Sequence, residues 1–240
     1  MGAGPASQGF GRCGRGNPME NIIFEDRRAA GRKLGDVLSR RVGRQAPIVV
    51  LGIPRGGVVV AAEVADILST PLDVIIARKV RAPDQPELGI GAVVNGDHIP
   101  VINKELVRAL GATPEYLSLE IAIQGGEIDR RLHFYRGNRP ALGLTGKTVI
   151  VVDDGIATGF TFRAALEGLH QRNPGRLVAA VPVAAPDSLE MIWAFADEVV
   201  CLSTPASFLA VGHWYRNFNQ VSDEEVVEIL RRNWSRNQSQ

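Results

Sequence analysis

The sequence lacks the features of a secreted or membrane-bound protein. Its 240 residues include only two cysteines, Cys13 and Cys201, which cannot make a disulfide framework and so indicate a reducing compartment. No apolar run approaches the length of a membrane span. The glycine-rich start has no apolar core of a secretory signal, and we predict a disordered tail over residues 1–18. We therefore predict a cytoplasmic location and no membrane partner.

An excess of charge of one sign is also missing, because 27 Lys and Arg residues balance 26 Asp and Glu residues. This balance argues against nucleic acid as a partner bound through bulk charge. A local basic patch stays open, because cations cluster in one predicted helix: Arg27, Arg28, Arg32, Lys33, Arg40 and Arg41. The alternative is a solvated helix face. No group of His, Cys and Asp residues has metal-ligand spacing, so no zinc site held by the protein is expected.

The most informative stretch is VIVVDDGIATGFT, at residues 149–161. Its four apolar residues predict a buried parallel strand that ends at two carboxylates, Asp153 and Asp154. A small-residue loop then leads into a predicted helix, whose free N–H groups and dipole would face an anion. The loop has hydroxyls and glycines that suit such a cradle: Thr158, Thr161, Gly155 and Gly159. The stretch predicts a phosphate cradle, and the alternative is a plain βα turn with a threonine cap.

A second strand–loop–helix unit precedes this stretch. Its turn, at residues 54–57, contains Arg55, Gly56 and Gly57. The Walker lysine is absent, which argues against a P-loop nucleotidase. A guanidinium beside backbone N–H groups predicts a second anion site. The alternative is a tight turn with a solvated arginine.

Strands alternate with helices at βαβ spacing, which predicts one doubly wound, mostly parallel α/β sheet. The predicted strands are 48–53, 72–77, 149–152, 177–184 and 198–202, and the predicted helices are 24–42, 58–68, 113–135, 162–169, 186–195 and 222–230. Thr113, followed by Pro114, and Ser222 are the predicted caps of the helices that they begin. Residues 88–94 and 98–102 predict a hairpin. We divide the chain into the 1–18 tail, one domain at 19–232 with a hood at 203–220, and a frayed tail at 233–240. Both predicted anion loops follow strands and so fall on the carboxyl edge of the sheet.

These residues resemble the type I phosphoribosyltransferases. Residues 149–161 are similar to that family's ribose-5-phosphate signature, in which four apolar residues, two acids and a small-residue loop end in T-G-x-T. Residues 53–57 match the place of its pyrophosphate loop. The stretches RKVRAPDQPELGIGAV and DEVVCLSTP…GHWYRNF also resemble a bacterial and archaeal subgroup without an assigned acceptor. The resemblance implies the same α/β sheet, with a small hood and a flexible loop at 78–87.

The chemistry implied by the resemblance is transfer of ribose 5-phosphate from phosphoribosyl pyrophosphate to an unidentified acceptor, expected to be a nitrogenous base. Pyrophosphate is released. The 5-phosphate would sit on the loop and first helical turn: Gly155, Ile156, Ala157, Thr158, Gly159, Phe160 and Thr161. Asp153 and Asp154 would accept hydrogen bonds from the ribose hydroxyls and favour a cationic transition state. The cofactor Mg²⁺ would arrive on pyrophosphate and hydroxyl oxygens, so the two acids would contact it only indirectly.

The departing pyrophosphate would meet Arg55 of the 54–57 turn and two cations of the predicted flexible loop, Lys79 and Arg81. Ala157 stands where the 6-oxopurine members carry an aspartate base, which argues against that mechanism. Any base must then come from elsewhere, and the candidates are Glu87 and Asp84 of the flexible loop.

The aromatic residues of the hood are candidates for binding the acceptor. Phe208, Trp214 and Tyr215 could stack on a planar acceptor, and His213 could hydrogen-bond to it. The alternative is that these rings fill the core beneath an irregular segment.

Two other functions stay open at this stage. One is a non-catalytic regulator that senses phosphoribosyl pyrophosphate or a nucleotide, since fold does not fix function. The other is hydrolysis of a sugar phosphate, with water in place of the acceptor. The resemblance also implies a homodimer.

Overall fold

The computed structural model of the chain describes residues 22–43, 46–95 and 99–237. The predicted tail at 1–18 and the residues 96–98 of the predicted hairpin turn lie outside these ranges. The strands are β1 (Ile48–Gly52), β2 (Leu72–Val74), β3 (Ala77–Ala82), β4 (Gln85–Val94), β5 (Ile99–Ile102), β6 (Thr148–Val152), β7 (Arg176–Val183) and β8 (Glu198–Ser203). The helices are α1 (Arg27–Arg41), α2 (Gly56–Leu68), α3 (Lys104–Ala109), α4 (Pro114–Arg136), α5 (Phe160–His170), α6 (Pro186–Trp193) and α7 (Asp223–Asn237), with a 3₁₀ turn at Val211–Trp214.

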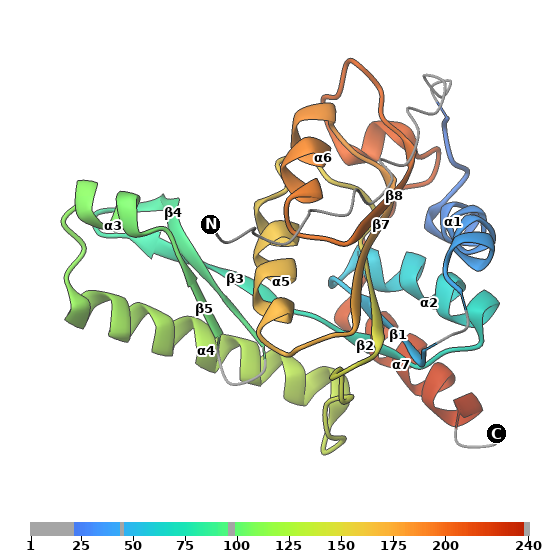
Figure 1. Cartoon of the computed structure of the whole chain (residues 1–240), viewed down its shortest axis with the longest axis horizontal. Coiled ribbons are helices and arrows are strands. Elements are labelled where there is room, and N and C mark those ends of the chain that lie inside the picture. The colour runs from blue at the N-terminus through green and yellow to red at the C-terminus, as the bar shows by residue number, and fades with distance from the viewer. Residues whose placement is uncertain (1–21, 44–45, 96–98, 238–240) are drawn as a thin grey trace, which may run out of the picture.

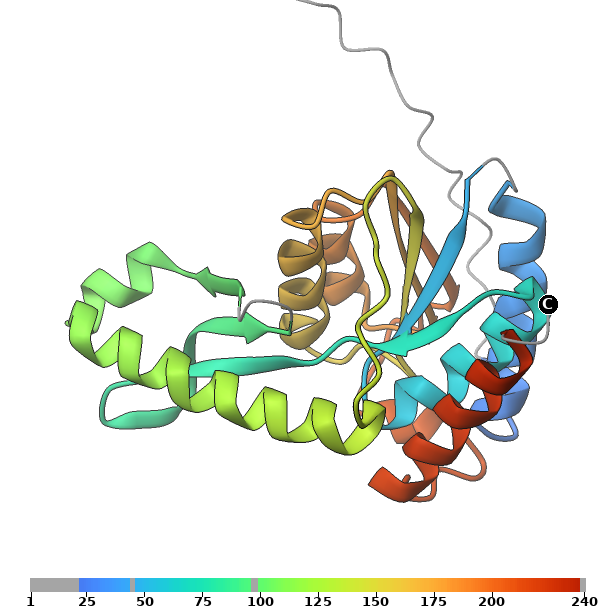
Figure 2. The same ribbon diagram turned by 90° about the horizontal axis from the view of Figure 1, so that it is seen from below.

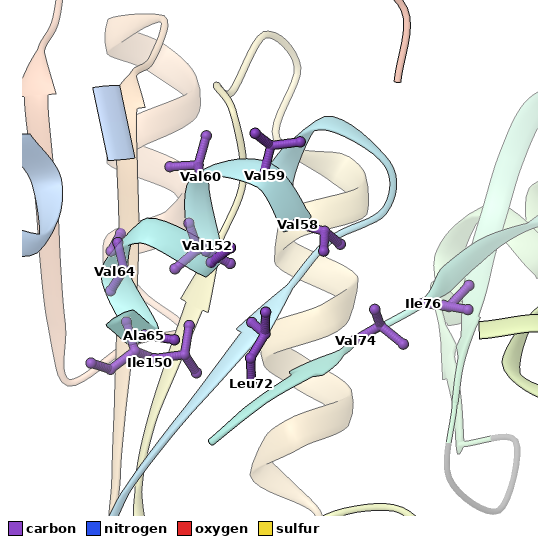
Figure 3. Packing of buried hydrophobic residues seen from close by; sticks show 14 of the residues in the cluster. Val58, Val59, Val60, Val64, Ala65, Leu72, Val74, Ile76, Ile150 and Val152 are labelled. Carbon is purple, nitrogen blue, oxygen red and sulfur yellow. The ribbon is translucent and has the colours of Figure 1, made fainter. Parts of the chain in front are cut away.

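A five-stranded parallel sheet in the order β2-β1-β6-β7-β8 forms the centre of the fold (Figure 1). Its strands are runs of branched apolar residues because both faces are covered. Helices α1, α2 and α7 pack on one face, where Val60 and Val64 lie near Ile150 and Val152 (Figure 3). Helices α5 and α6 pack on the other face. The prediction of a doubly wound, mostly parallel sheet is confirmed.

Strands β1 and β6 are the neighbours that position the site. They pair in parallel from Ile48 opposite Thr148 to Gly52 opposite Val152. The amide of Ile53 then donates to the carbonyl oxygen of Val152 at 2.9 Å. Because the two strands end level with each other, the loops that follow them leave the sheet at the same edge.

The helix-start residues expected from the sequence cap their helices. Thr113 Oγ1 accepts from the amide of Tyr116 at 3.2 Å, with Pro114 as the first residue of α4. Ser222 Oγ accepts from the amide of Glu225 at 3.1 Å at the start of α7. Both predicted caps are confirmed.

The prediction of a frayed tail from residue 233 is wrong as far as Asn237, where α7 ends. Asn233 is only 4% exposed, and its Oδ1 accepts from the amide of Leu72 at 2.9 Å. Trp234 Nε1 donates to the carbonyl oxygen of Leu72 at 2.9 Å. These contacts tie the last turns of the helix to the edge strand β2 and so keep them folded.

An arm, which we define as residues 77–136, projects from one side of the parallel sheet (Figures 1 and 2). It contains the antiparallel sheet β3-β4-β5, the short helix α3, which was not predicted, and the long helix α4. The predicted pairing of 88–94 with 98–102 is confirmed for the described residues by β4 and β5.

Residues 78–87 do not form the flexible loop that was predicted. They form β3 and the start of β4, which pair from Ala77 opposite Val94 to Ala82 opposite Gln85. Helix α4 holds these residues as strands, because Arg81 Nε donates to Glu120 Oε1 at 2.6 Å and Arg78 Nε donates to Gln124 Oε1 at 2.7 Å. Arg78 and Arg81, which the sequence places in a solvated loop, therefore bind side chains of a helix that is distant in the chain.

Candidate active site

The two loops at the carboxyl edge of β1 and β6 pack directly on each other. A β-carbon placed on Gly56 would lie 1.9 Å from Asp154 Oδ2, and one on Gly57 would lie 2.7 Å from Asp153 Oδ1. No side chain fits in either space, so glycine is required for the approach of the loops. The predicted meeting of the two loops at one sheet edge is confirmed. The peptide bond between Pro54 and Arg55 is cis.

The acid pair, Asp153 and Asp154, has two different environments. Asp153 Oδ1 accepts from the amide of Asp154 at 2.8 Å. Burial, and next the charge of Asp154, raise the pKa of Asp153 well above its ordinary value. Asp154 Oδ2 instead accepts from Arg27 Nε at 2.7 Å. One carboxylate therefore has a cationic partner, and the other is turned into the protein.

Arg27 is the site residue that the sequence reasoning missed. It was assigned to a solvated charge run, but its side chain is only 11% exposed. Residues three and seven positions later on α1, Ala30 and Leu34, are fully buried. Arg27 thus shares the apolar face of its helix, and this spacing was the signal that could have found it.

The N-terminus of α5 forms an open cradle of backbone amides. Gly159 precedes the helix with φ +74° and caps it with no side-chain hydrogen bond. In the part of the chain that the structure describes, the amides of Ala157, Thr158 and Gly159 have no hydrogen-bond acceptor. The hydroxyl-bearing residues Thr158 and Thr161 are exposed. Free amides at a helix start make a site that suits an anion.

The rest of the loop is fixed by its neighbours. The amide of Ile156 donates to the carbonyl oxygen of Val183 at 2.9 Å, which ties the loop to the end of β7. Ser188 Oγ donates to the carbonyl oxygen of Ala157 at 2.5 Å. A β-carbon on Gly155 would lie 2.6 Å from Val211 Cγ1 of the hood. The large side chain of Phe160 is 67% exposed beside the cradle.

The hood, residues 203–220, brings aromatic rings against the site. Phe208 and Trp214 stack on each other with centroids 6.3 Å apart and pack against the core. Tyr215 is 5% exposed, and its hydroxyl donates to the carbonyl oxygen of Asp154. His213 is exposed. These rings occupy the positions expected if they fill the core beneath the hood.

The remaining predicted residues lie on the arm rather than at the loops. Lys79 Nζ donates to the carbonyl oxygen of Glu87 at 2.5 Å, and Arg81 pairs with Glu120. A cavity of about 280 Å³ lies between β3 and α4, lined by Ala77, Arg78, Lys79, Arg81 and Gln124. Asp84 lies in the turn between β3 and β4 with φ +58°. Among the described residues, no hydrogen bond or ion pair joins these side chains to the acid pair.

The donor set of the site suits a metal held indirectly. Within residues 22–43, 46–95 and 99–237, no three His, Cys, Asp or Glu side chains gather as a metal site. Asp154 pairs with Arg27, and Asp153 Oδ1 accepts from a backbone amide, so the two acids suit a hydrated Mg²⁺ that is held through ligand oxygens. None of the described helices has the length and apolar content needed to cross a membrane.

Comparisons with known proteins show the family of the chain. A family model described as "Phosphoribosyl transferase domain" matches residues 23–216. Two Mycobacterium tuberculosis proteins, from strains CDC 1551 and H37Rv, are provisionally named phosphoribosyl transferases and are 44% identical over 210 residues. The match covers 88% of this chain and 47% of each relative, so the chain spans about half the length of the curated relatives it matches.

A solved structure is also similar. The crystal structure of TT1426 from Thermus thermophilus has a TM-score of 0.78 and 46% sequence identity. The match covers 87% of this chain and 98% of that one. The similarity therefore extends over most of both chains.

Proposed function

The chain belongs to the phosphoribosyl transferase domain family, and from this premise we propose that it moves ribose 5-phosphate from phosphoribosyl pyrophosphate to a nitrogenous base. The observation that carries the proposal is the packing of Gly56 and Gly57 against the acid pair. An anion on the first loop and a ribose diol at the second would then belong to one ligand. The open amides of α5 lie on the same loop and suit the 5-phosphate.

Each part of the donor has a proposed partner. The 5-phosphate would accept from the amides of residues 157–161 and from the hydroxyls of Thr158 and Thr161. Asp154 would accept from a ribose hydroxyl, with Asp153 behind it. Arg55 and the amides of its loop would neutralise the pyrophosphate as it leaves.

The reaction breaks the bond between ribose C1 and a pyrophosphate oxygen and forms one between C1 and an acceptor nitrogen. The nitrogen passes its proton to water or to the departing pyrophosphate, and pyrophosphate keeps the electron pair of the broken bond. Positive charge develops on the ribose ring, and the carboxylate of Asp154 would stabilise it from nearby. Bound through the oxygens of the donor, Mg²⁺ would neutralise charge on the leaving group.

The arm and the hood contribute less to the proposed site than the two loops do. Lys79, Arg81 and Glu87 were candidates for pyrophosphate binding and for the base, but they pair with one another and with Glu120. The proposal therefore rests on Arg55. We propose that Phe208 and Trp214 shape the hood beside the acceptor, since each ring is stacked on the other.

We further propose that the protein acts in the cytoplasm as a homodimer. Its two cysteines support a reducing compartment, and burial raises the pKa of the Cys201 thiol to about 12. Three large apolar side chains of α4 that are exposed to solvent, Leu119, Ile123 and Phe134, support the dimer.

Thermal unfolding with and without ligand tests the site. Phosphoribosyl pyrophosphate with Mg²⁺, at about 100 times its Kd, is expected to raise the Tm by about 5–10 °C. A double variant, Asp153→Asn with Asp154→Asn, should lose this shift, because the ribose hydroxyls lose their charged acceptors. The control is Asp36→Asn, which changes an exposed carboxylate on α1 and should keep the shift.

Product analysis separates the three functions. Pyrophosphate release that depends on an added free base or small amine supports transfer, and release without any acceptor indicates hydrolysis. Ligand-induced stabilisation without release in a broad acceptor screen indicates a sensor. If phosphoribosyl pyrophosphate with Mg²⁺ leaves the Tm of the unaltered protein unchanged, transfer, hydrolysis and sensing of this donor are all contradicted.

A further inference from the structure

Helix α1 carries two kinds of arginine. Arg28 and Arg32 are 39% and 56% exposed, and both pair with Glu63 on α2. Arg27 is 11% exposed and points the other way, toward the acid pair. A buried arginine must have partners for its charge and its donors, because burial without them is costly. The contacts of Arg27 therefore indicate its role in the site.

The guanidinium of Arg27 contacts three separate segments. Its Nε donates to Asp154 Oδ2 at 2.7 Å, and its Nη1 donates to the carbonyl oxygen of Asn219 at 2.7 Å. Its Cζ lies over the ring of Phe218, 3.8 Å from the ring centroid. It also fills the space above Gly56, where a β-carbon would lie 2.7 Å from Nε. One planar group thus joins both loops of the site to the end of the hood.

Backbone pairing holds this arginine in place. The amide of Phe24 donates to the carbonyl oxygen of Trp214 at 2.8 Å, and the amide of Arg216 donates back to Phe24 at 2.9 Å. The amide of Asn217 donates to the carbonyl oxygen of Glu25 at 2.9 Å. The segment before α1 therefore runs beside the hood and delivers Arg27 to the site.

We infer that Arg27 is the positioning residue of this site, which fixes the Asp154 carboxylate against the 56–57 loop and fastens the hood over both. Two adjacent carboxylates repel each other, so Asp154 would turn toward solvent without a cation beside it. A lysine could replace the charge but not the second directed hydrogen bond or the stacking on Phe218. The part of the inference that concerns ribose binding rests on the proposed function, while the fastening of the hood does not.

The test compares Arg27→Gln and Arg27→Lys with a matched control on the same helix, Arg28→Gln. Hydrogen exchange of the ligand-free proteins is measured first. In Arg27→Gln the hood amides at 212–219 should exchange at least tenfold faster, with the amides of β1 and β6 unchanged. Arg27→Lys should be intermediate, and Arg28→Gln should match the unaltered protein. Unchanged hood exchange in Arg27→Gln overturns the inference, whatever the protein binds.

Calorimetric titration with phosphoribosyl pyrophosphate and Mg²⁺ forms the second arm. Arg27→Gln should raise the Kd at least tenfold, and Arg27→Lys should restore part of the affinity, which a loss of folding would not allow. Equal affinity in Arg27→Gln and the unaltered protein contradicts the role of Arg27 toward Asp154. If the unaltered protein binds no donor, the proposed function fails, and hydrogen exchange alone decides the inference.

Discussion

Asp153 and Asp154 are neighbours in the chain, but the fold gives their carboxylates opposite surroundings. Asp154 has the guanidinium of Arg27 at 2.7 Å. Among the described residues, Asp153 has only the amide of Asp154 as a hydrogen-bond donor, and burial raises the pKa of Asp153 well above its ordinary value. Ionisation of Asp153 therefore lowers the free energy of unfolding, and a perturbed carboxylate of this kind is typical of a functional site.

The stability of the fold should depend on pH through Asp153. A raised folded-state pKa gives a contribution that is complete below the unfolded value and is lost as the pH rises through the folded value. The isosteric variant Asp153→Asn keeps the acceptor oxygen and removes this loss. Its Tm should exceed that of the unaltered protein at pH 7, by about 2–4 °C for each kcal/mol of relief, and the two should converge near about pH 4.

Melting curves from pH 4 to 8 check this prediction. Asp154→Asn is the matched control, and the opposite sign is expected at pH 7, because it leaves the buried cation of Arg27 without its carboxylate. A lower Tm for Asp153→Asn than for the unaltered protein at pH 7 would contradict the account.

Single residues were predictable where the reason for their identity is local. The acids, the glycines and the hydroxyls of residues 153–161 follow one strand, so one stretch of sequence displays the cradle. Arg27 could not be placed that way, because its partners Asp154 and Asn219 lie 127 and 192 residues along the chain. Only its spacing from Ala30 and Leu34 on the buried face marks it.

At the scale of elements, the arm is held by a polar network between β3 and α4. Glu120 is 5% exposed, and its Oε1 accepts from Arg81 Nε at 2.6 Å and from Gln124 Nε2 at 3.0 Å. Gln124, 4% exposed, accepts from Arg78. Tyr116 adds a bond from its hydroxyl to the carbonyl oxygen of Arg81 at 3.1 Å. Every buried group named here has a partner, which makes the junction rigid.

Removing the central acceptor should loosen the arm and nothing else. Glu120→Ala removes the partner of Arg81 and leaves the buried side-chain amide of Gln124 without its acceptor, the latter at a cost of about 1–3 kcal/mol. Hydrogen exchange should become faster in β3 and the first half of α4, with β1 and β6 unchanged. The matched control is Glu87→Ala, since Glu87 is fully exposed on the same arm and should change neither. Faster exchange across the whole chain would indicate global destabilisation and contradict a local network.

The sequence predicted those elements whose own residues indicate whether they are buried, exposed or at a helix start. Strands β1 and β6 are apolar runs that suit only a sheet covered on both faces, and Thr113 and Ser222 cap the helices that they begin. Residues 78–87 could not be predicted as strand, because the charge of Arg81 has no partner in the local sequence and gains one only when the fold brings Glu120 beside it. The last turns of α7 depend in the same way on β2.

At the scale of the whole molecule, α4 exposes large apolar side chains that a monomer would leave in water. Leu119, Ile123 and Phe134 are 62%, 49% and 47% exposed, and a β-carbon on Gly126 would meet nothing within 4 Å. These four residues share one face of the helix, which runs along the arm (Figure 2). Arg130, 66% exposed, lies on the same face between Gly126 and Phe134. Exposed apolar side chains grouped in this way are typical of a contact surface.

We propose that a second copy of the chain packs on this face, with the two α4 helices antiparallel. Glu115, near the start of the helix, would then lie close to Arg130 of the other copy, so opposite charges would meet at both ends. Ile123 of each copy faces the space left by Gly126 of the other, and the helix dipoles oppose. Because one helix pair buries less than a standard interface, we expect a dimer that dissociates on dilution.

Sedimentation velocity over a dilution series tests this dimer. The unaltered chain should shift from dimer to monomer as the concentration falls, because the small interface gives only a moderate affinity. Ile123→Glu should be monomeric throughout, since it places a charge in the closest contact, and Glu115→Arg should weaken the dimer by placing like charges together. Leu209→Glu, which alters an 81% exposed side chain on the hood, is the control and should leave the dimer intact. A monomer at every concentration, or a dimer that Ile123→Glu leaves unchanged, would show that α4 is not the surface through which copies of the chain meet.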